Sequence, residues 1–164
     1  MSSRRHFIQR SSALLGLAAA APWLARGAFA LDPAQLLQRR IPDSDERLPV
    51  IGLGTSRTFN VSLDDASLSP LDEVMRTFIN GGGSLIDTAP SYGNAEAVSG
   101  ELLRRTGTQG KALLASKVSA SGRERGMAQV AASLRALQTD RLDLLQVHNL
   151  QDTRTQLGLL RELK

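Results

Sequence analysis

Apolar and polar residues recur along this chain in two rhythms, one typical of strands and the other typical of helices. Short apolar runs predict strands at 51–54, 85–87, 113–117 and 142–148. Apolar residues spaced three or four positions apart predict helices at 70–80, 95–105, 126–137 and from about 153 onward. Ahead of this series, residues 38–41 and 48–50 flank a turn-like segment at 42–45 and predict a β-hairpin. The pattern therefore predicts an α/β fold in which strands and helices alternate.

The first of these helices carries recognisable boundary residues. Ser69 is a favourable N-cap, and Pro70 suits the first helical position. Asp72 and Glu73 would then lie in the first turn, where the helix dipole favours acidic side chains. The glycines at 81–83 predict the end of this helix.

The later helices are each predicted to bury one apolar face. For the helix at 95–105, Asn94 is the expected N-cap. The faces predicted for the last two helices are Met127, Val130, Ala131 and Leu134, and then Leu157, Leu160 and Leu163.

The ends of the four predicted strands, Gly54, Asp87, Lys117 and His148, are 33, 30 and 31 residues apart. A repeat of this length is what eight βα units in a (β/α)8 TIM barrel of roughly 250 residues require. An open doubly wound sheet also alternates strands and helices. The glycine pattern at 52–57 lacks the third glycine of the dinucleotide fingerprint, which favours the barrel.

Charge is distributed unevenly along the chain. There are 20 basic and 16 acidic residues, and every acid lies at Asp32 or later, whereas Arg4, Arg5, Arg10 and Arg26 precede it. From Asp32 onward the charges therefore balance at 16 of each sign. Because the basic excess belongs to the start of the chain, we expect no nucleic-acid partner.

Met1–Ala30 has the order of a signal peptide: a basic start, an Ala/Leu-rich stretch at 13–21, and small residues flanking Phe29 before Leu31. The arginine pair and the apolar pair after it resemble the twin-arginine motif, which implies export of a folded protein to the periplasm by the twin-arginine (Tat) machinery. An ordinary Sec signal is the alternative. The apolar stretch is shorter than the roughly 20 residues that cross a bilayer, so we expect no permanent membrane anchor.

Polar side chains follow successive strands, at the edge where barrel enzymes place their sites. Asp87, Lys117 and His148 end three predicted parallel strands, and Tyr92 follows Asp87 in the next loop. Taken singly, Asp87 could stabilise a turn, Lys117 could be solvated, His148 could be a core imidazole, and Tyr92 could cover the barrel rim. Taken together, they must meet in one small space, which favours a catalytic site.

Four sequence blocks carry a family resemblance. They are LPVIGLGT (48–55), IDTAPSYG (86–93), ASKV (115–118) and SLRALQTDRLDLLQVH (133–148). From about residue 48 onward, the chain resembles the aldo/keto reductases. The resemblance implies an NADP(H)-dependent oxidoreductase that reduces aldehydes or ketones, and therefore a small-molecule carbonyl substrate.

The resemblance also implies a role for each candidate residue. Tyr92 would be the proton donor, Lys117 and Asp87 would tune it, and His148 would orient the substrate carbonyl. The residues implied to lie near the cofactor are Gly54, Thr55 and Ser56. No metal site is expected.

The chain is thus divided into a signal peptide at 1–30, an N-terminal segment with the hairpin at 31–50, and an aldo/keto reductase domain at 51–164. About the first four βα units of the barrel are present, so we expect the N-terminal half of the domain, inactive unless the barrel is completed. An open sheet leaves two strand edges, which predicts self-association. The alternative to an enzyme is a non-catalytic exported binding or assembly protein that retains a half-barrel.

Overall fold

The computed structural model describes residues 36–164. The signal peptide predicted at Met1–Ala30 lies outside the described residues. The described part opens with an antiparallel hairpin of β1 (Gln38–Arg40) and β2 (Arg47–Pro49), which confirms the hairpin prediction.

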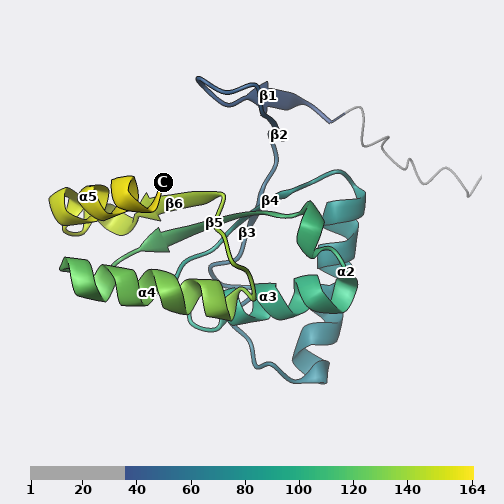
Figure 1. Cartoon of the computed structure of the whole chain (residues 1–164). Helices are drawn as coiled ribbons and strands as arrows, with labels where there is room; N and C mark the ends of the chain where they lie inside the picture. The colour runs from purple at the N-terminus through teal and green to yellow at the C-terminus, as the bar shows by residue number, and fades with distance from the viewer. Residues whose placement is uncertain (1–35) are drawn as a thin grey trace, which may run out of the picture. The chain divides into compact units, whose positions relative to one another are not determined.

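Four strands form a parallel sheet whose order in space is their order in the chain (Figure 1). They are β3 (Leu53–Gly54), β4 (Leu85–Asp87), β5 (Leu113–Val118) and β6 (Leu144–Val147). The predicted α/β fold with a parallel sheet is confirmed. The first strand is shorter than predicted, because only its last two residues pair with β4. The last strand ends at Val147, because His148 begins a 3-10 turn, η4 (His148–Leu150).

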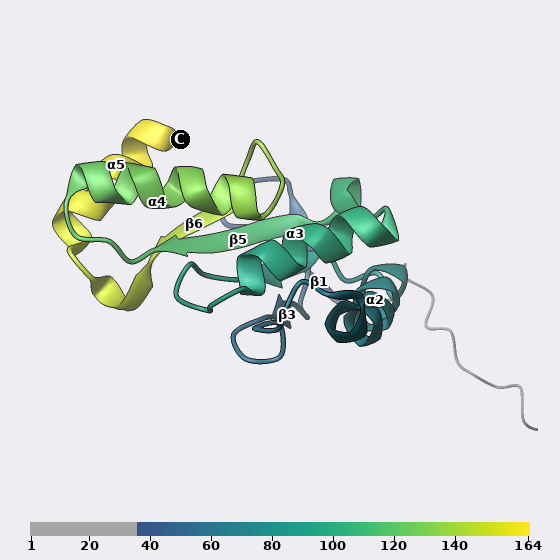
Figure 2. The ribbon, with the colours of Figure 1, turned by 90° about the horizontal axis from the view of Figure 1, so that it is seen from below.

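Helices alternate with these strands. They are α2 (Asp65–Asn80), α3 (Ala95–Thr106), α4 (Arg123–Ala136) and α5 (Thr153–Leu163), and a 3-10 helix, η3 (Gln109–Lys111), precedes β5. Successive helices pack on one another, α2 on α3, α3 on α4 and α4 on α5. In Figure 2, α3 and α4 lie side by side along β5. The helices therefore cover one face of the strands, and the opposite face and the carboxyl ends of the strands are free to form a site.

Helix α2 begins earlier than predicted. Asp64, rather than Ser69, is the N-cap: its carboxylate accepts a hydrogen bond from the Ser67 N–H at 2.9 Å, which lowers the pKa of Asp64. The start predicted at Pro70 is wrong, since Pro70 lies inside the helix and the Ser69 hydroxyl donates to the Asp65 carbonyl at 2.7 Å. An aspartate cap and an additional turn of helix outweigh the one backbone hydrogen bond that the proline cannot make.

The placement of Asp72 in a first turn is wrong for the same reason. Asp72 lies in the middle of α2, where it accepts two hydrogen bonds from Arg105 Nε and Nη2 at 3.0 and 2.8 Å. Arg105 Nη1 also donates to Asp65 at 2.6 Å. These bonds tie the end of α3 to α2, and they raise the pKa of Arg105.

The buried face of α4 differs from the predicted one. The helix begins at Arg123, three residues before its predicted start, and Gly126 lies buried inside it. Of the four residues predicted to share the apolar face, Met127 and Ala131 are exposed and only Val130 is buried. The helix turns Gly126 toward α5, where an added Cβ would lie 2.8 Å from Leu159.

The apolar face predicted for α5 is also wrong. Gln156 and Leu159 are buried, whereas Leu157 and Leu163 are each 44% exposed. The reason is that Gln156 fills the space beside Gly126 on α4, a role that apolar periodicity cannot reveal.

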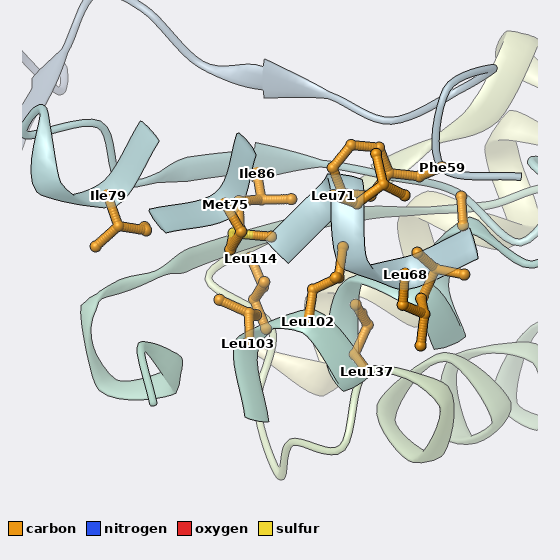
Figure 3. Close-up of a cluster of buried hydrophobic side chains, with 12 residues drawn as sticks. Phe59, Leu68, Leu71, Met75, Ile79, Ile86, Leu102, Leu103, Leu114 and Leu137 are labelled. Atoms are coloured by element: carbon orange, nitrogen blue, oxygen red, sulfur yellow. The ribbon is translucent and has the colours of Figure 1, made fainter. Parts of the chain in front are cut away.

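A hydrophobic core lies between the sheet and the first two helices (Figure 3). Its members are Phe59, Leu68, Leu71, Met75, Ile79, Ile86, Ala95, Val98, Leu102, Leu103, Leu114 and Leu137. Most of them belong to α2 and α3. Within residues 36–164, β6 and α5 add none of the residues in this cluster.

A buried carboxylate joins three elements next to this core. Glu96, in the first turn of α3, accepts hydrogen bonds from Ser116 Oγ of β5 at 2.6 Å and from Ser133 Oγ of α4 at 3.1 Å. The partially positive N-terminal end of α3 favours a negative charge at this position. Glu96 thereby holds α3 and α4 against the strand that carries Lys117.

Candidate active site

Three of the predicted catalytic residues come from the carboxyl ends of neighbouring strands. Asp87 ends β4, Lys117 is next to last in β5, and His148 follows β6. In the sheet register, Asp87 pairs with Ala115. Because side chains alternate along a strand, Asp87 and Lys117 project from the same face, opposite to the core residue Ile86.

The Lys117 side chain forms an ion pair with Asp87 on the neighbouring strand. Its Nζ lies 2.8 and 2.7 Å from the two carboxylate oxygens of Asp87, and it also donates to the Thr88 carbonyl at 2.9 Å. The side chain of Lys117 is only 12% exposed, and that of Asp87 is 39% exposed. Lys117 is therefore not a solvated strand end, since three acceptor atoms hold its ammonium in one place.

Tyr92 lies in the loop between β4 and α3. Its ring centroid is 5.1 Å from Lys117 Nζ and 5.8 Å from the centroid of the His148 ring, which it meets edge-on at 88°. The next residue, Gly93, has a φ of +64°, and an added Cβ would overlap the Asn60 side chain. Asn60 Oδ1 in turn accepts from the Asn94 N–H at 3.0 Å, so this loop is bonded to the loop before α2.

His148 is half-buried and begins the turn after β6. Its Nδ1 lies 3.2 Å from Ser91 Oγ. Asn149, Leu150 and Asp152 have φ values of +51°, +57° and +47°, in the left-handed region that non-glycine residues rarely adopt. Such backbone strain is concentrated at functional sites in proteins.

The residues predicted to lie near a cofactor occupy the end of β3, beside Asp87. Thr55 is buried, and both its N–H and its hydroxyl donate to the Asp87 carbonyl, at 3.1 and 3.0 Å. Gly54 and Ser56 are exposed on either side of it. Thr55 thus holds the end of β3 against β4, and its two neighbours present the accessible surface.

The structure adds two groups that sequence reasoning missed. The Thr88 carbonyl completes the set of acceptors around Lys117, and Ser91 contacts His148. A backbone carbonyl leaves no sequence signal. Ser91 could have been noticed only through its position next to Tyr92.

The loop after β5, residues 119–122, is held by hydrogen bonds to several side chains, among them Gln129, Gln156 and Asp152. Gln129 Oε1 accepts from two of its N–H groups at 2.7 and 3.1 Å, and Gln156 Nε2 donates to two of its carbonyls at 3.0 and 3.2 Å. Asp152 accepts from the Gly122 N–H at 2.8 Å, and this bond holds the pKa of Asp152 below its usual range. Residues near the site are therefore held by polar contacts that originate in α4 and α5.

Between residues 36 and 164, no helix combines the length and apolar character needed to span a bilayer. The same residues contain no group of three His, Cys, Asp or Glu side chains placed to bind a metal ion.

Four parallel βα units carry Asp, Tyr, Lys and His side chains at or just after their strand ends. This arrangement is typical of part of a βα barrel. The sequence model of the aldo/keto reductase family matches residues 50–164. The chain therefore belongs to the aldo/keto reductase family.

Individual relatives agree with this assignment. The chain is 32% identical over 120 residues to the aldo-keto reductase YhdN of Bacillus subtilis, an alignment that covers 66% of this chain and 36% of the relative. It is 39% identical over 108 residues to the methylglyoxal reductase YeaE of Escherichia coli, covering 63% and 36%. The matched part thus spans about a third of the length of these relatives.

A solved structure confirms the architecture. An aldo-keto reductase from Klebsiella pneumoniae in complex with NADPH superimposes with a TM-score of 0.57 and 30% identity. The match covers 71% of this chain and 43% of that structure. The parallel sheet of this chain therefore matches part of an aldo/keto reductase TIM barrel.

Proposed function

We propose that this chain supplies the catalytic strand ends of an NADPH-dependent reductase that converts aldehydes or ketones to alcohols. One observation carries the proposal: Lys117, paired with Asp87, and the His148 ring both lie close to the ring of Tyr92, at 5.1 and 5.8 Å from its centroid. Because the match spans 36% of the length of the bacterial relatives, the reaction is proposed for the complete barrel.

Tyr92 is the proton donor in this proposal. Carbonyl reduction adds a hydride to carbon and a proton to oxygen, and a tyrosine that gives up its proton becomes a phenolate. Lys117 stabilises that negative charge, since its Nζ lies 5.1 Å from the centroid of the ring over which the charge spreads. Two unit charges at about this distance attract by roughly 3 kcal/mol at an effective dielectric constant near 20. Asp87 holds the ammonium in position, at the cost of offsetting part of its field.

His148 orients the carbonyl. A neutral imidazole can donate one hydrogen bond to the oxygen on which negative charge develops during hydride transfer. Its ring meets that of Tyr92 edge-on, with the centroids 5.8 Å apart, and we propose that the two donors act on one oxygen atom.

We propose that a nicotinamide cofactor binds at the end of β3. An added Cβ at Gly54 would meet no atom within 4 Å, so the backbone there is open to a ligand beside Asp87. We assign the cofactor contacts to Gly54 and Ser56 and a supporting role to Thr55, whose hydroxyl is already bonded. The cofactor, when bound, supplies the hydride. The NADPH in the Klebsiella pneumoniae structure supports this choice.

A small carbonyl compound is the proposed substrate class. The Escherichia coli relative is named for the reduction of methylglyoxal, which is consistent with a site built around one carbonyl oxygen. The half of the barrel described in this structure provides the groups that act on that oxygen.

The roles can be tested by joining these 164 residues to the remaining βα units of a family barrel and measuring NADPH oxidation with a panel of aldehydes. Tyr92→Phe removes only the phenol hydroxyl and should lower kcat about 100- to 10,000-fold, with unchanged NADPH affinity. Lys117→Met should also lower kcat strongly. The matched control Lys111→Met, at an exposed lysine in η3, should leave kcat unchanged. Full turnover in Tyr92→Phe would assign the proton to another donor.

For the 164-residue chain alone, we propose self-association through its two sheet edges, β3 and β6, without micromolar NADPH binding or carbonyl reduction. The apolar side chains of Leu144, Leu157 and Leu163 near the β6 edge are exposed, which supports association. Light scattering combined with an NADPH fluorescence titration tests this, and a monomer that binds NADPH would contradict it.

We also propose that the protein is exported to the periplasm by the twin-arginine machinery and cleaved before Leu31. Lysine substitution of both Arg4 and Arg5 should abolish export, and intact-mass analysis of the exported protein should give Leu31 as its first residue. Undiminished export of the double-lysine variant would exclude the twin-arginine route.

A further inference from the structure

We propose that Ser91 is a positioning residue for His148, and that its hydroxyl determines which imidazole nitrogen carries the proton. Ser91 Oγ lies 3.2 Å from His148 Nδ1, although the two residues are 57 positions apart in the chain. Among residues 36–164, no other side chain forms a hydrogen bond with this imidazole. The inference depends on the proposed function only for its effect on turnover.

The chemistry of neutral imidazole gives this contact its meaning. One ring nitrogen carries a proton and donates, while the other accepts, and the hydrogen bond made by one nitrogen decides the state of the other. When Ser91 donates to Nδ1, the proton lies on Nε2, which is then the donor available to a substrate carbonyl. When Ser91 accepts instead, Nε2 is left as an acceptor and would repel a carbonyl oxygen.

The hydroxyl of Ser91 is free to take the donor role. Within the described part of the chain, its only hydrogen bond is the one to His148. A serine hydroxyl can donate as well as accept, and donation from Ser91 to Nδ1 leaves the imidazole proton on Nε2. A carbonyl substrate at Nε2 requires the arrangement in which Ser91 donates.

Ser91 also links His148 to the proton donor. The Tyr92 N–H donates to the Ala89 carbonyl at 3.0 Å, which closes a tight turn with Pro90 at the position that favours proline. Ser91 and Tyr92 are therefore adjacent residues of one rigid turn. A ring held by Ser91 is held relative to Tyr92, which is the geometry that two donors to one oxygen need.

The chain segment around His148 does little to fix the orientation of the imidazole ring. His148 follows the last strand, and the next two residues, Asn149 and Leu150, have left-handed backbone conformations. The imidazole is half-buried, so packing leaves part of it exposed. An external hydrogen bond at Nδ1 is thus the polar contact that sets the ring's orientation.

Nitrogen NMR of the full-length 15N-labelled chain tests the proposal without any need for activity. The chain has two histidines, His6 and His148, and a His6→Gln variant assigns the signals. At about pH 8.5, well above the ordinary histidine pKa of about 6.5, we expect a protonated Nε2 and an acceptor Nδ1 in His148. In Ser91→Ala, both signals should move toward their positions in the urea-unfolded chain.

Two variants separate positioning from general damage to the fold. Ser91→Thr retains the hydroxyl and should keep the wild-type imidazole signals. Ser69→Ala, at an exposed serine of α2, is the matched control and should not move them. Unchanged backbone amide spectra in Ser91→Ala would show that the fold is intact. A proton on Nδ1 in the wild type, or identical imidazole signals in Ser91→Ala, would overturn the proposal.

Turnover in the completed barrel provides the second readout. Loss of one oriented hydrogen bond should lower kcat about 5- to 10-fold in Ser91→Ala, with KM nearly unchanged and with recovery in Ser91→Thr. If Tyr92→Phe retains full turnover while the imidazole signals respond to Ser91, the proposed reaction is wrong and the positioning contact stands. If the imidazole signals do not respond, the positioning contact is wrong whatever the reaction.

Discussion

The two flanks of the sheet are stabilised in different ways. On the flank of α2, β4 and α3, a cluster of fully buried apolar side chains fills the space between helices and strands. On the flank of β6 and α5, the apolar side chains of Leu144, Leu157 and Leu163 are 44–47% exposed, and Leu159 is the buried leucine of the helix. Polar contacts replace the core there, with Gln156 and Asp152 bonded to the loop after β5.

The candidate site crosses the boundary between these flanks. Asp87 and Tyr92 belong to the apolar flank, Lys117 lies on the strand next to it, and His148 belongs to the polar flank. Water competes for polar contacts more effectively than for a buried apolar cluster. We therefore expect the position of His148 to be more sensitive to substitutions than the Asp87–Lys117 pair.

The largest expected effect comes from removing a core leucine. Leu102 of α3 is fully buried, whereas Leu157 of α5 is 44% exposed. Leu102→Ala should lower the free energy of unfolding by about 2–5 kcal/mol, and Leu157→Ala by less than about 1 kcal/mol. Urea denaturation followed by circular dichroism measures both. Equal losses would show that the two flanks are packed to the same degree.

Two glycine substitutions should change the free energy of unfolding in opposite directions. An added Cβ at Gly100 of α3 would lie 2.6 Å from the Ala136 carbonyl oxygen, whereas at Gly158 of α5 it would meet nothing within 4 Å. Gly100→Ala should therefore separate α3 from α4 and cost about 1–3 kcal/mol. Gly158→Ala should stabilise the protein by about 0.5–1 kcal/mol, because alanine is the better helix former. Thermal unfolding of the two variants distinguishes these outcomes.

Gln156 tests the polar flank directly. Gln156→Leu keeps most of the side-chain volume but removes both hydrogen bonds to the carbonyls of the loop at 119–122. We expect a loss of about 1 kcal/mol and faster hydrogen exchange of the amides in this loop. Gln109→Leu, at an exposed glutamine of η3, is the control. Unchanged exchange in Gln156→Leu would mean that Gln129 and Asp152 hold the loop without it.

The smallest effect concerns acid stability at the surface of the apolar flank. Hydrogen bonds from Arg104 lower the pKa of Glu101 from 4.5 to about 2. Because the folded state lowers this pKa, the pair stabilises the protein above about pH 4.5, and this contribution is lost as the pH falls toward 2. The pair is partly exposed, so the loss should not exceed about 1 kcal/mol. Glu101→Gln should reduce the dependence of the free energy of unfolding on pH between about 4.5 and 2, while Glu73→Gln should not. Urea denaturation at a series of pH values measures this.

The parts of the fold that depend on local pattern could be predicted from the sequence. Apolar runs located β4 at its observed bounds, and the spacing of strand ends brought Asp87, Lys117 and His148 to one edge. The start of α2 could not be located in this way, because Asp64 and Ser69 are both residue types that cap helices. In addition, the hydrogen bond that Arg105 donates to Asp72 joins residues 33 positions apart. The burial of Gln156 and the contact of Ser91 with His148 also depend on segments distant in the chain.

Strand order that follows chain order affects how this protein can fold. Each strand pairs only with the one before it and the one after it, and paired residues are 28 to 33 positions apart. Moderate sequence separation of contacts favours faster folding than pairing between distant ends of a chain. During synthesis, β4 can pair with β3 and gather α2 and α3 before β6 has been made. The apolar core would then be the first region protected from hydrogen exchange, and the strand that leads to His148 would be added to a sheet that already holds Asp87 and Lys117.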